Sequence, residues 1–375
     1  MQIIKIAEEE RIPKKFLEQI LLEMRNAGIL YSKKGAGGGY SLNKAPEDIF
    51  LSQVMRLIDG PIALLPCVSL NFYRSCDECT EEHACGIRDT FAEASAAVGF
   101  DLWQIAQSGE GLDQTEFTQP VLLTASIALW RVWLELGGVA PKYMAGHSLG
   151  EYSALVASGA LSLGDAVKLV NLRGKLMQTA VPQGVGAMAA ILGLDDTKVI
   201  ELCAKATEAG EGSVEAANYN AQGQVVVAGN KERVEAVMAL AKENGAKAIA
   251  LPVSVPSHCS LMKPAAEQFA PALEQTAIEM PRIPVLQNVG AQAAVDVTEL
   301  RQALTAQLYE SVQWTKTLQF LQDEGVEYIV ECGPGNVLAN MAKRLPNIEK
   351  ALPLDTKSRL EDALNTVLVA EGKIA

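Results

Sequence analysis

Residues 143–151 read YMAGHSLGE, in which the pattern Gly-x-Ser-x-Gly joins a short apolar run to a helical run. This pattern is typical of a nucleophile elbow, a sharp turn from strand to helix that raises a serine above a parallel sheet. Gly146 and Gly150 are expected to allow the tight turn, and the hydroxyl of Ser148 would lie at the positive end of the helix. A pentapeptide this short also recurs by chance, but here its strand and helix context are both present. Ser148 is therefore the candidate nucleophile.

A serine nucleophile needs an adjacent base, and the chain has only three histidines. His83 belongs to a different region of the chain, and the side chain of His147 is expected to leave the turn away from the serine, as a polar or packing support. His258 ends the apolar stretch 253–258, at the kind of strand end where active-site residues of parallel sheets gather. It is the candidate general base, although a single histidine at a strand end is often structural.

From Phe91 to about Ala351 helices alternate with short apolar strands, which is typical of a parallel sheet covered on both faces. Within this region, residues 186–253 predict the order strand, helix, strand, strand, helix, strand of a split ferredoxin-like domain. The expected strands are 186–192, 214–220, 224–228 and 247–253, and the expected helices are 195–209 and 231–244. The predicted fold is thus α/β, an α/β-hydrolase-like parallel sheet with an inserted ferredoxin-like subdomain and a substrate cleft between them. The boundaries are 90–184 and 255–354 for the sheet, 185–254 for the insertion and 355–375 for a C-terminal helix or tail.

Arg173 lies in a helical stretch and has apolar neighbours at helical spacing, among them Leu169 and Met177. A guanidinium held in such surroundings could bind a substrate carboxylate through two parallel hydrogen bonds. A salt bridge at the end of a helix is the alternative interpretation.

Residues 1–89 differ from the rest of the chain in their charge and in their sequence pattern. Residues 1–44 carry eight Lys and Arg against five Asp and Glu, whereas the whole chain has a formal net charge of -13. Helical patterns followed by two short strands around the basic, glycine-rich loop 33–39 give the order of a winged helix, which would contact DNA through residues 1–44. An ordinary solvated helix and a flexible hairpin are the alternative.

Four of the seven cysteines lie within nineteen residues of one another. Because the chain has an odd number of cysteines and no secretion signal or apolar run long enough to cross a membrane, we expect a protein of the reducing cytoplasm without membrane contact. Clustered thiolates there favour an iron–sulfur cluster or zinc, with a free thiol sensor as the alternative. The candidate ligands are Cys67, Cys76, Cys79 and Cys85.

The elbow at 146–151, Arg173, the stretch 253–258 and three further motifs together resemble the malonyl-CoA:acyl carrier protein transacylases of fatty-acid biosynthesis. The further motifs are Thr-Gln-Pro at 118–120, Gln-Leu-Tyr at 307–309 and Gly-Pro-Gly at 333–335. The resemblance runs from about Thr90 to Leu354, and it implies a transferase that needs no cofactor and has malonyl-CoA and acyl carrier protein as partners.

The same resemblance implies the roles of individual residues. Ser148 would take the malonyl group from coenzyme A as an ester, His258 would move the protons, and the acyl group would pass to the phosphopantetheine thiol of the carrier protein. Arg173 would bind the free malonyl carboxylate, Gln307 would orient His258 in place of a triad acid, and the amide of Leu149 would donate to the oxyanion.

One part of the family pattern is missing. The family begins with a strand and a Gly-Gln-Gly-Ser-Gln loop that supplies a second oxyanion amide, and no such motif stands upstream of Phe91. Losing one oxyanion donor slows acyl transfer by roughly two to three orders of magnitude, so the sequence predicts an impaired enzyme with an exposed edge of its core.

Residues 1–90 resemble the Rrf2 family of winged-helix transcription regulators, through FLEQIL at 16–21, GAGGGY at 35–40 and the cysteines that follow. The first helix and the long dimerisation helix of that family are not intact here. This second resemblance implies two alternatives to the transferase: a DNA-binding regulator with metal- or redox-sensing cysteines, or a non-functional fusion of the two parts.

Overall fold

The computed structural model describes residues 17–18, 21–22, 24–25, 29–33, 39–43, 86–182, 184–253 and 255–373. It divides into two compact units, Met1–Cys76 and Asp77–Ala375.

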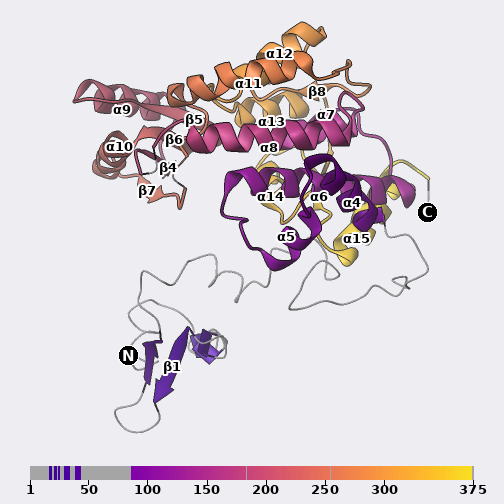
Figure 1. Ribbon diagram of the computed structural model, residues 1–375, viewed down its shortest axis with the longest axis horizontal. Coiled ribbons are helices and arrows are strands. Elements are labelled where there is room, and N and C mark those ends of the chain that lie inside the picture. Colours follow the sequence, from indigo (N-terminus) through magenta and orange to yellow (C-terminus); the bar gives the residue numbers. More distant parts are fainter. Residues whose placement is uncertain are drawn as a thin grey trace. The chain divides into compact units, whose positions relative to one another are not determined.

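The described part of the first unit contains an antiparallel hairpin (Figure 1). Strand β1 (Leu30–Lys33) pairs with β2 (Gly39–Leu42), with Leu30 opposite Leu42. The two strands flank the glycine-rich loop as expected, and Leu17 and Leu21 are buried at helical spacing. Most of the predicted winged helix lies outside the described residues, and so does the whole cysteine cluster, so this part of the prediction stays a prediction.

The helices between residues 86 and 179 pack against one another. Helix α4 runs without a break across the place where the two family resemblances meet, and Phe91 and Ala94 on it are fully buried against α6 and α8. The boundary between the resemblances is thus an interior part of a helix. The helices in this range are α4 (Gly86–Val98), α5 (Leu102–Ser108), α6 (Thr115–Glu135), α7 (Gly150–Ala157) and α8 (Leu163–Thr179).

The parallel strands form two separate pairs. Strand β3 (Met144–Ala145) pairs with β8 (Val285–Leu286), and β9 (Tyr328–Glu331) pairs with β10 (Lys350–Pro353), both in parallel. Both pairs are parallel, as the predicted α/β fold requires, and no strand of the described residues joins one pair to the other.

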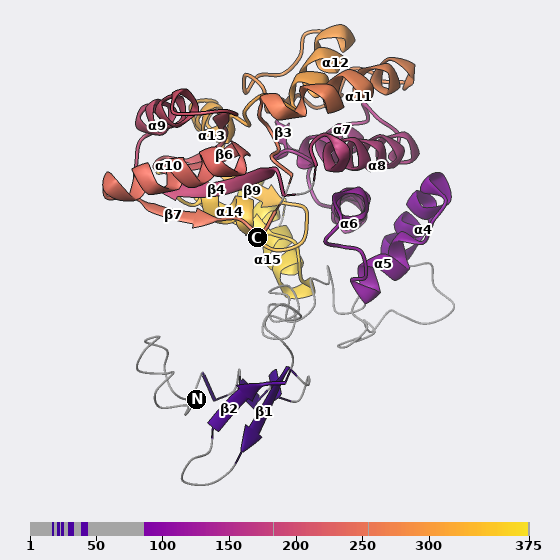
Figure 2. The ribbon, with the colours of Figure 1, turned by 60° about the vertical axis from the view of Figure 1, so that its left-hand side comes forward.

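The inserted unit has the predicted strand and helix order. Its strands are β4 (Gly186–Leu192), β5 (Val214–Ala221), β6 (Gln224–Asn230) and β7 (Lys247–Ala250), with α9 (Asp196–Glu208) and α10 (Lys231–Glu243) between them. The sheet is antiparallel in the order β5-β6-β4-β7, which is the ferredoxin-like arrangement, and the two helices cover one face of it (Figure 2). A parallel bridge between Asn218 and Val312 ties this sheet to the rest of the unit.

The remaining helices complete the second unit. Helix α11 lies beside α8, and α15 occupies the predicted C-terminal helix (Figure 1). Among the described residues, no helix has both the length and the apolar character that a membrane span requires. These elements are η3 (Ser260–Met262), α11 (Lys263–Gln275), α12 (Val297–Ala306), α13 (Trp314–Asp323), α14 (Val337–Ala342) and α15 (Lys357–Ala370).

Candidate active site

The turn between β3 and α7 is strained at Ser148, whose φ is 51°. Residues other than glycine rarely adopt this left-handed backbone conformation, and those that do are frequent at active sites. A Cβ atom at Gly146 would overlap the carbonyl carbon of Gly150, whereas one at Gly150 would meet open space. The structure therefore needs glycine at 146, whereas the space around Gly150 would admit a Cβ atom.

Asn288 holds this strained turn in place. Its Oδ1 accepts from the amide of Ser148 at 2.6 Å, and its Nδ2 donates to the carbonyl of Gly146 at 2.6 Å. The side chain is 2% exposed, so both bonds are shielded from water. No motif in the sequence marks Asn288, although it stands two residues after the apolar strand β8, much as His258 stands at the end of an apolar stretch.

Ser148 and His258 form a hydrogen-bonded pair, with 2.8 Å between Oγ and Nε2. On the other side of the ring, Nδ1 lies 2.7 Å from the backbone carbonyl of Gln307. Because a carbonyl only accepts, Nδ1 carries the proton and Nε2 is left to accept from the serine. Gln307 thus orients His258 with its main chain rather than with its side chain.

Burial, and to a smaller extent the nearby Arg173 cation, lower the pKa of His258 to about 3. The ring is 4% exposed, so water does not compensate a charge on it. His258 is therefore neutral at neutral pH, which is the state that a general base must have before it takes a proton.

Arg173 is 1% exposed and lies against the nucleophile. Its Nη2 donates to Ser148 Oγ at 3.2 Å and to the side-chain oxygen of Gln307 at 3.0 Å, while Nη1 donates to the side-chain oxygen of Gln119 at 2.8 Å. Nε has no hydrogen-bond partner, and among the described residues no carboxylate forms a salt bridge with this cation. The salt-bridge alternative is therefore wrong there. A buried cation with unused donors is suited to binding an anion.

Glu151 is the other charged group of the site and is fully buried. Its Oε2 accepts from the amide of Asn288 at 2.9 Å and from Nε2 of Gln307 at 2.8 Å. Burial raises the pKa of this carboxyl to about 7, against the lowering effect of Asn288, Gln307 and Arg173. Glu151 fixes the amide of Gln307 and through it Arg173, a role that the sequence analysis did not foresee.

The two neighbours of Ser148 in the chain face different surroundings. The amide of Leu149, directly before α7, donates no hydrogen bond within the described part of the chain. It is thus available for a developing oxyanion. His147 instead hydrogen-bonds Asn220 of β5 at 2.8 Å and lies edge-on to Trp314, which fits a supporting residue.

The described cysteines are unsuited to catalysis. Burial raises the pKa of the thiols of Cys203, Cys259 and Cys332 to about 12, so each stays protonated. Within the described ranges, no group of three or more His, Cys, Asp or Glu residues could hold a metal ion.

Two family models match the chain. The Acyl transferase domain model matches residues 83–351, and the model of the Iron-dependent Transcriptional regulator family Rrf2 matches residues 1–105. The matches overlap at residues 83–105, the stretch that includes the unbroken helix α4.

Among curated relatives, the malonyl CoA-acyl carrier protein transacylase of Salmonella typhimurium is 51% identical over 282 residues, which are 74% of this chain and 90% of the relative. That of Haemophilus influenzae is 54% identical over 261 residues, which are 68% of this chain and 83% of the relative.

Solved structures of malonyl transacylases are also similar to this chain. The crystal structure of FabD from Acinetobacter baumannii has 77% sequence identity and a TM-score of 0.76, and covers 76% of this chain and 91% of that chain. A type II PKS acyl-carrier protein in complex with its malonyl-transacylase has 47% identity and a TM-score of 0.72, and covers 75% of this chain and 91% of that chain.

Proposed function

Because the chain belongs to the Acyl transferase domain family, we propose that it transfers a malonyl group from malonyl-CoA to the phosphopantetheine thiol of acyl carrier protein. The reaction serves fatty-acid biosynthesis. The strongest support for this proposal is the position of the buried Arg173, whose Nη2 lies 3.2 Å from the nucleophile Oγ of Ser148. A cation at this place distinguishes an acyl group that ends in a carboxylate from one that does not.

In the first half of the reaction, Ser148 Oγ attacks the thioester carbonyl of malonyl-CoA while His258 Nε2 takes its proton. The carbonyl oxygen becomes an oxyanion and accepts from the Leu149 amide. The intermediate then collapses, the bond from carbon to sulfur breaks, and the coenzyme A thiolate leaves with the proton from His258. Malonyl-Ser148 and coenzyme A are the products of this half.

In the second half, the phosphopantetheine thiol gives its proton to His258 and attacks the ester carbonyl of malonyl-Ser148. The proton returns to Ser148 Oγ as the ester bond breaks. Because coenzyme A leaves before the carrier protein reacts with malonyl-Ser148, the kinetics are ping-pong. Arg173 keeps the malonyl carboxylate in place throughout, while Gln119 and Gln307 keep the guanidinium in place.

The expected slow rate stays part of the proposal. The amide of Ser148 itself is occupied by Asn288, which leaves the amide of Leu149 as the oxyanion donor of this proposal. With one donor rather than two, transfer is expected to be slower by roughly two to three orders of magnitude than with a complete oxyanion hole.

The test is transfer itself. The full chain is incubated with malonyl-CoA and holo acyl carrier protein, and malonylated carrier protein is measured by mass spectrometry. Transfer that disappears in His258→Ala, with the circular dichroism unchanged, supports the proposal. Malonylation of the carrier protein at equal rates with wild type and His258→Ala would contradict it.

The N-terminal unit supports a second proposal, because the Rrf2 model matches residues 1–105 and β1 and β2 form the expected hairpin. We propose that residues 1–44 bind DNA and that an iron–sulfur cluster or zinc is bound by the four clustered cysteines, Cys67, Cys76, Cys79 and Cys85. Binding of labelled duplex DNA that weakens steeply with salt, together with iron or zinc in the purified chain, would support this. If the chain binds neither metal nor DNA, a non-functional fusion becomes the favoured interpretation of this unit.

We also propose that the protein acts in the cytoplasm. The described cysteines are all unpaired thiols, as in a reducing compartment. Fractionation of the source cells followed by immunoblotting would test the location.

A further inference from the structure

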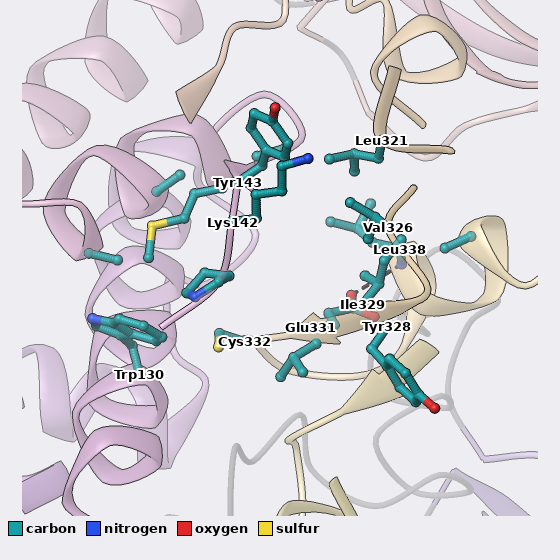
Figure 3. Close-up of a pocket in the computed structure, with 18 of the residues that line it drawn as sticks. Trp130, Lys142, Tyr143, Leu321, Val326, Tyr328, Ile329, Glu331, Cys332 and Leu338 are labelled. Atoms are coloured by element: carbon teal, nitrogen blue, oxygen red, sulfur yellow. Dashed lines mark hydrogen bonds between the residues drawn. The ribbon is translucent and has the colours of Figure 1, made fainter. Parts of the chain in front are cut away.

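A cavity of about 460 Å³ lies between β3 and β9, beside the catalytic residues but not lined by Ser148, His258 or Arg173 (Figure 3). Residues 142–146, which include β3, form one wall of it, and residues 326–332, which include β9, form another. Side chains from α6, α7, α13, α14 and α15 complete the lining, and most of them are apolar. We call this cavity the strand slot.

The strand slot faces the unpaired edges of two strands. Strand β3 uses one edge to pair with β8, and β9 uses one edge to pair with β10. No residue of β8 or β10 lines the slot, so the edges of β3 and β9 that face it are the opposite ones. No strand within the described ranges pairs with these edges. Their backbone N–H and C=O groups therefore need partners from elsewhere.

The two walls run in the same direction and are fixed to each other at one end. Lys142 Nζ donates to the carbonyl of Glu324 at 3.1 Å and to its carboxylate at 3.0 Å, and the Tyr143 hydroxyl donates to the same carboxylate at 2.6 Å. Lys142 stands just before β3 and Glu324 stands before β9, so both strands start at this end and both lead toward the edge where Ser148 lies. An added strand that runs parallel to both would end beside the elbow.

The dimensions suit one short strand. The wall at 142–146 has five residues, and at about 3.3 Å for each residue of a parallel strand a guest of about five residues matches it. A strand buried on both faces within a parallel sheet is apolar at successive positions. Such a guest would connect the two parallel pairs into the single sheet that the sequence predicts.

We propose that the strand slot binds an extended, apolar peptide of about five residues from a partner chain, which adds a central parallel strand between β3 and β9. The recognition comes from the two open backbone edges, and the apolar lining selects the side chains. The inference does not depend on the proposed transferase reaction, because it concerns binding alone.

The probe is a fluorescein-labelled synthetic peptide, Lys-Lys-Val-Ile-Val-Ile-Val-Gly, whose two lysines keep it in solution and stand at its amino end. Its binding to the full chain is followed by fluorescence anisotropy, and amide hydrogen exchange maps the contact. The matched control peptide has the same side chains but carries N-methyl groups on alternate amides, which removes strand hydrogen bonds. We expect saturable binding, binding of the control peptide at least about tenfold weaker, and slower exchange at residues 143–145 and 328–331.

Protein variants test the same point from the other side. Ala157 lines the slot from α7, and Ala157→Trp would fill it, whereas Ala239→Trp adds the same ring on the exposed face of α10. We expect the first variant to lose peptide binding and the second to keep it. Ser126→Leu, which reaches into the slot from α6, serves the same purpose if Ala157→Trp does not fold.

Three results would overturn the proposal. They are equal binding of the two peptides, exchange protection away from β3 and β9, and no binding at all, including the case in which another part of this chain already fills the slot. None of these results bears on malonyl transfer, so the two proposals fail or stand separately.

Discussion

Replacement of Arg173 by alanine tests how the site selects its acyl group. The guanidinium has five N–H donors, of which three are used in the bonds to Ser148, Gln307 and Gln119. Two donors, one of them the unpartnered Nε–H, are left for a ligand. In the variant the malonyl carboxylate would be placed in a buried region with no cation to receive it.

The size of the effect follows from these contacts. A hydrogen bond to a charged group contributes about 1.5–3 kcal/mol, so losing two of them costs about 3–4 kcal/mol at the lower end of that range. This lowers kcat/KM for malonyl-CoA by about 10²–10³. Acetyl-CoA has no free carboxylate, so its kcat/KM is expected to change by less than about tenfold.

The assay compares both substrates with one enzyme preparation. Release of coenzyme A is followed for malonyl-CoA and acetyl-CoA with wild type and Arg173→Ala, and the ratio of the two kcat/KM values is the quantity of interest. Loss of folding would lower both values together and leave the ratio unchanged. A ratio that is the same in wild type and in a folded variant would refute the assignment of Arg173 to the malonyl carboxylate.

Three more outcomes follow from the site. Gln307→Ala keeps the main-chain carbonyl that orients His258 and removes the side-chain amide that holds Arg173. We therefore expect malonyl selectivity to fall more than the rate of acetyl transfer. A larger fall in the rate of acetyl transfer would argue against orientation of His258 by the main chain of Gln307. Because the pKa of His258 is lowered to about 3, the base stays neutral as the pH falls through 6.5. The pH profile of kcat/KM in Glu151→Gln should therefore show no inflection near 6.5. An inflection that persists there would mean that His258 has the ordinary pKa of a histidine. Any inflection near 7 in the wild type should vanish in Glu151→Gln, because the pKa of Glu151 is raised to about 7. Gly146→Ala forces a Cβ into the backbone of Gly150, and we expect it to abolish labelling of Ser148, whereas Gly150→Ala should be tolerated if the clash at 146 is the cause.

Local patterns in the sequence predict much of this structure. The elbow follows from five residues and their flanks, and the inserted unit follows from alternating periods of two and 3.6 residues, because each element there contributes its own apolar face. Strand β7 ends at Ala250, three residues before the predicted end, since its pairing with β4 covers only residues 247–250.

Contacts between distant parts of the chain could not be predicted in the same way. Asn288 and Glu151 stand 137 residues apart, and their value lies in a hydrogen-bonded network that exists only when the chain is folded. The main-chain role of Gln307 is also invisible in sequence, because every residue has a carbonyl. Which strands pair with β3 and β9 is also a long-range property, and the short apolar runs of the sequence do not determine it.

The most direct measurement is acid-quenched labelling of the full chain with radiolabelled malonyl-CoA, without carrier protein. Ser148→Ala removes the nucleophile, and Ser153→Ala, on the helix α7 that follows the turn, is the matched control. The account predicts label on the wild type and on Ser153→Ala, recovered in the peptide that contains Ser148, and none on Ser148→Ala. No label on a wild-type protein that circular dichroism shows to be folded, or equal label on Ser148→Ala, would contradict it.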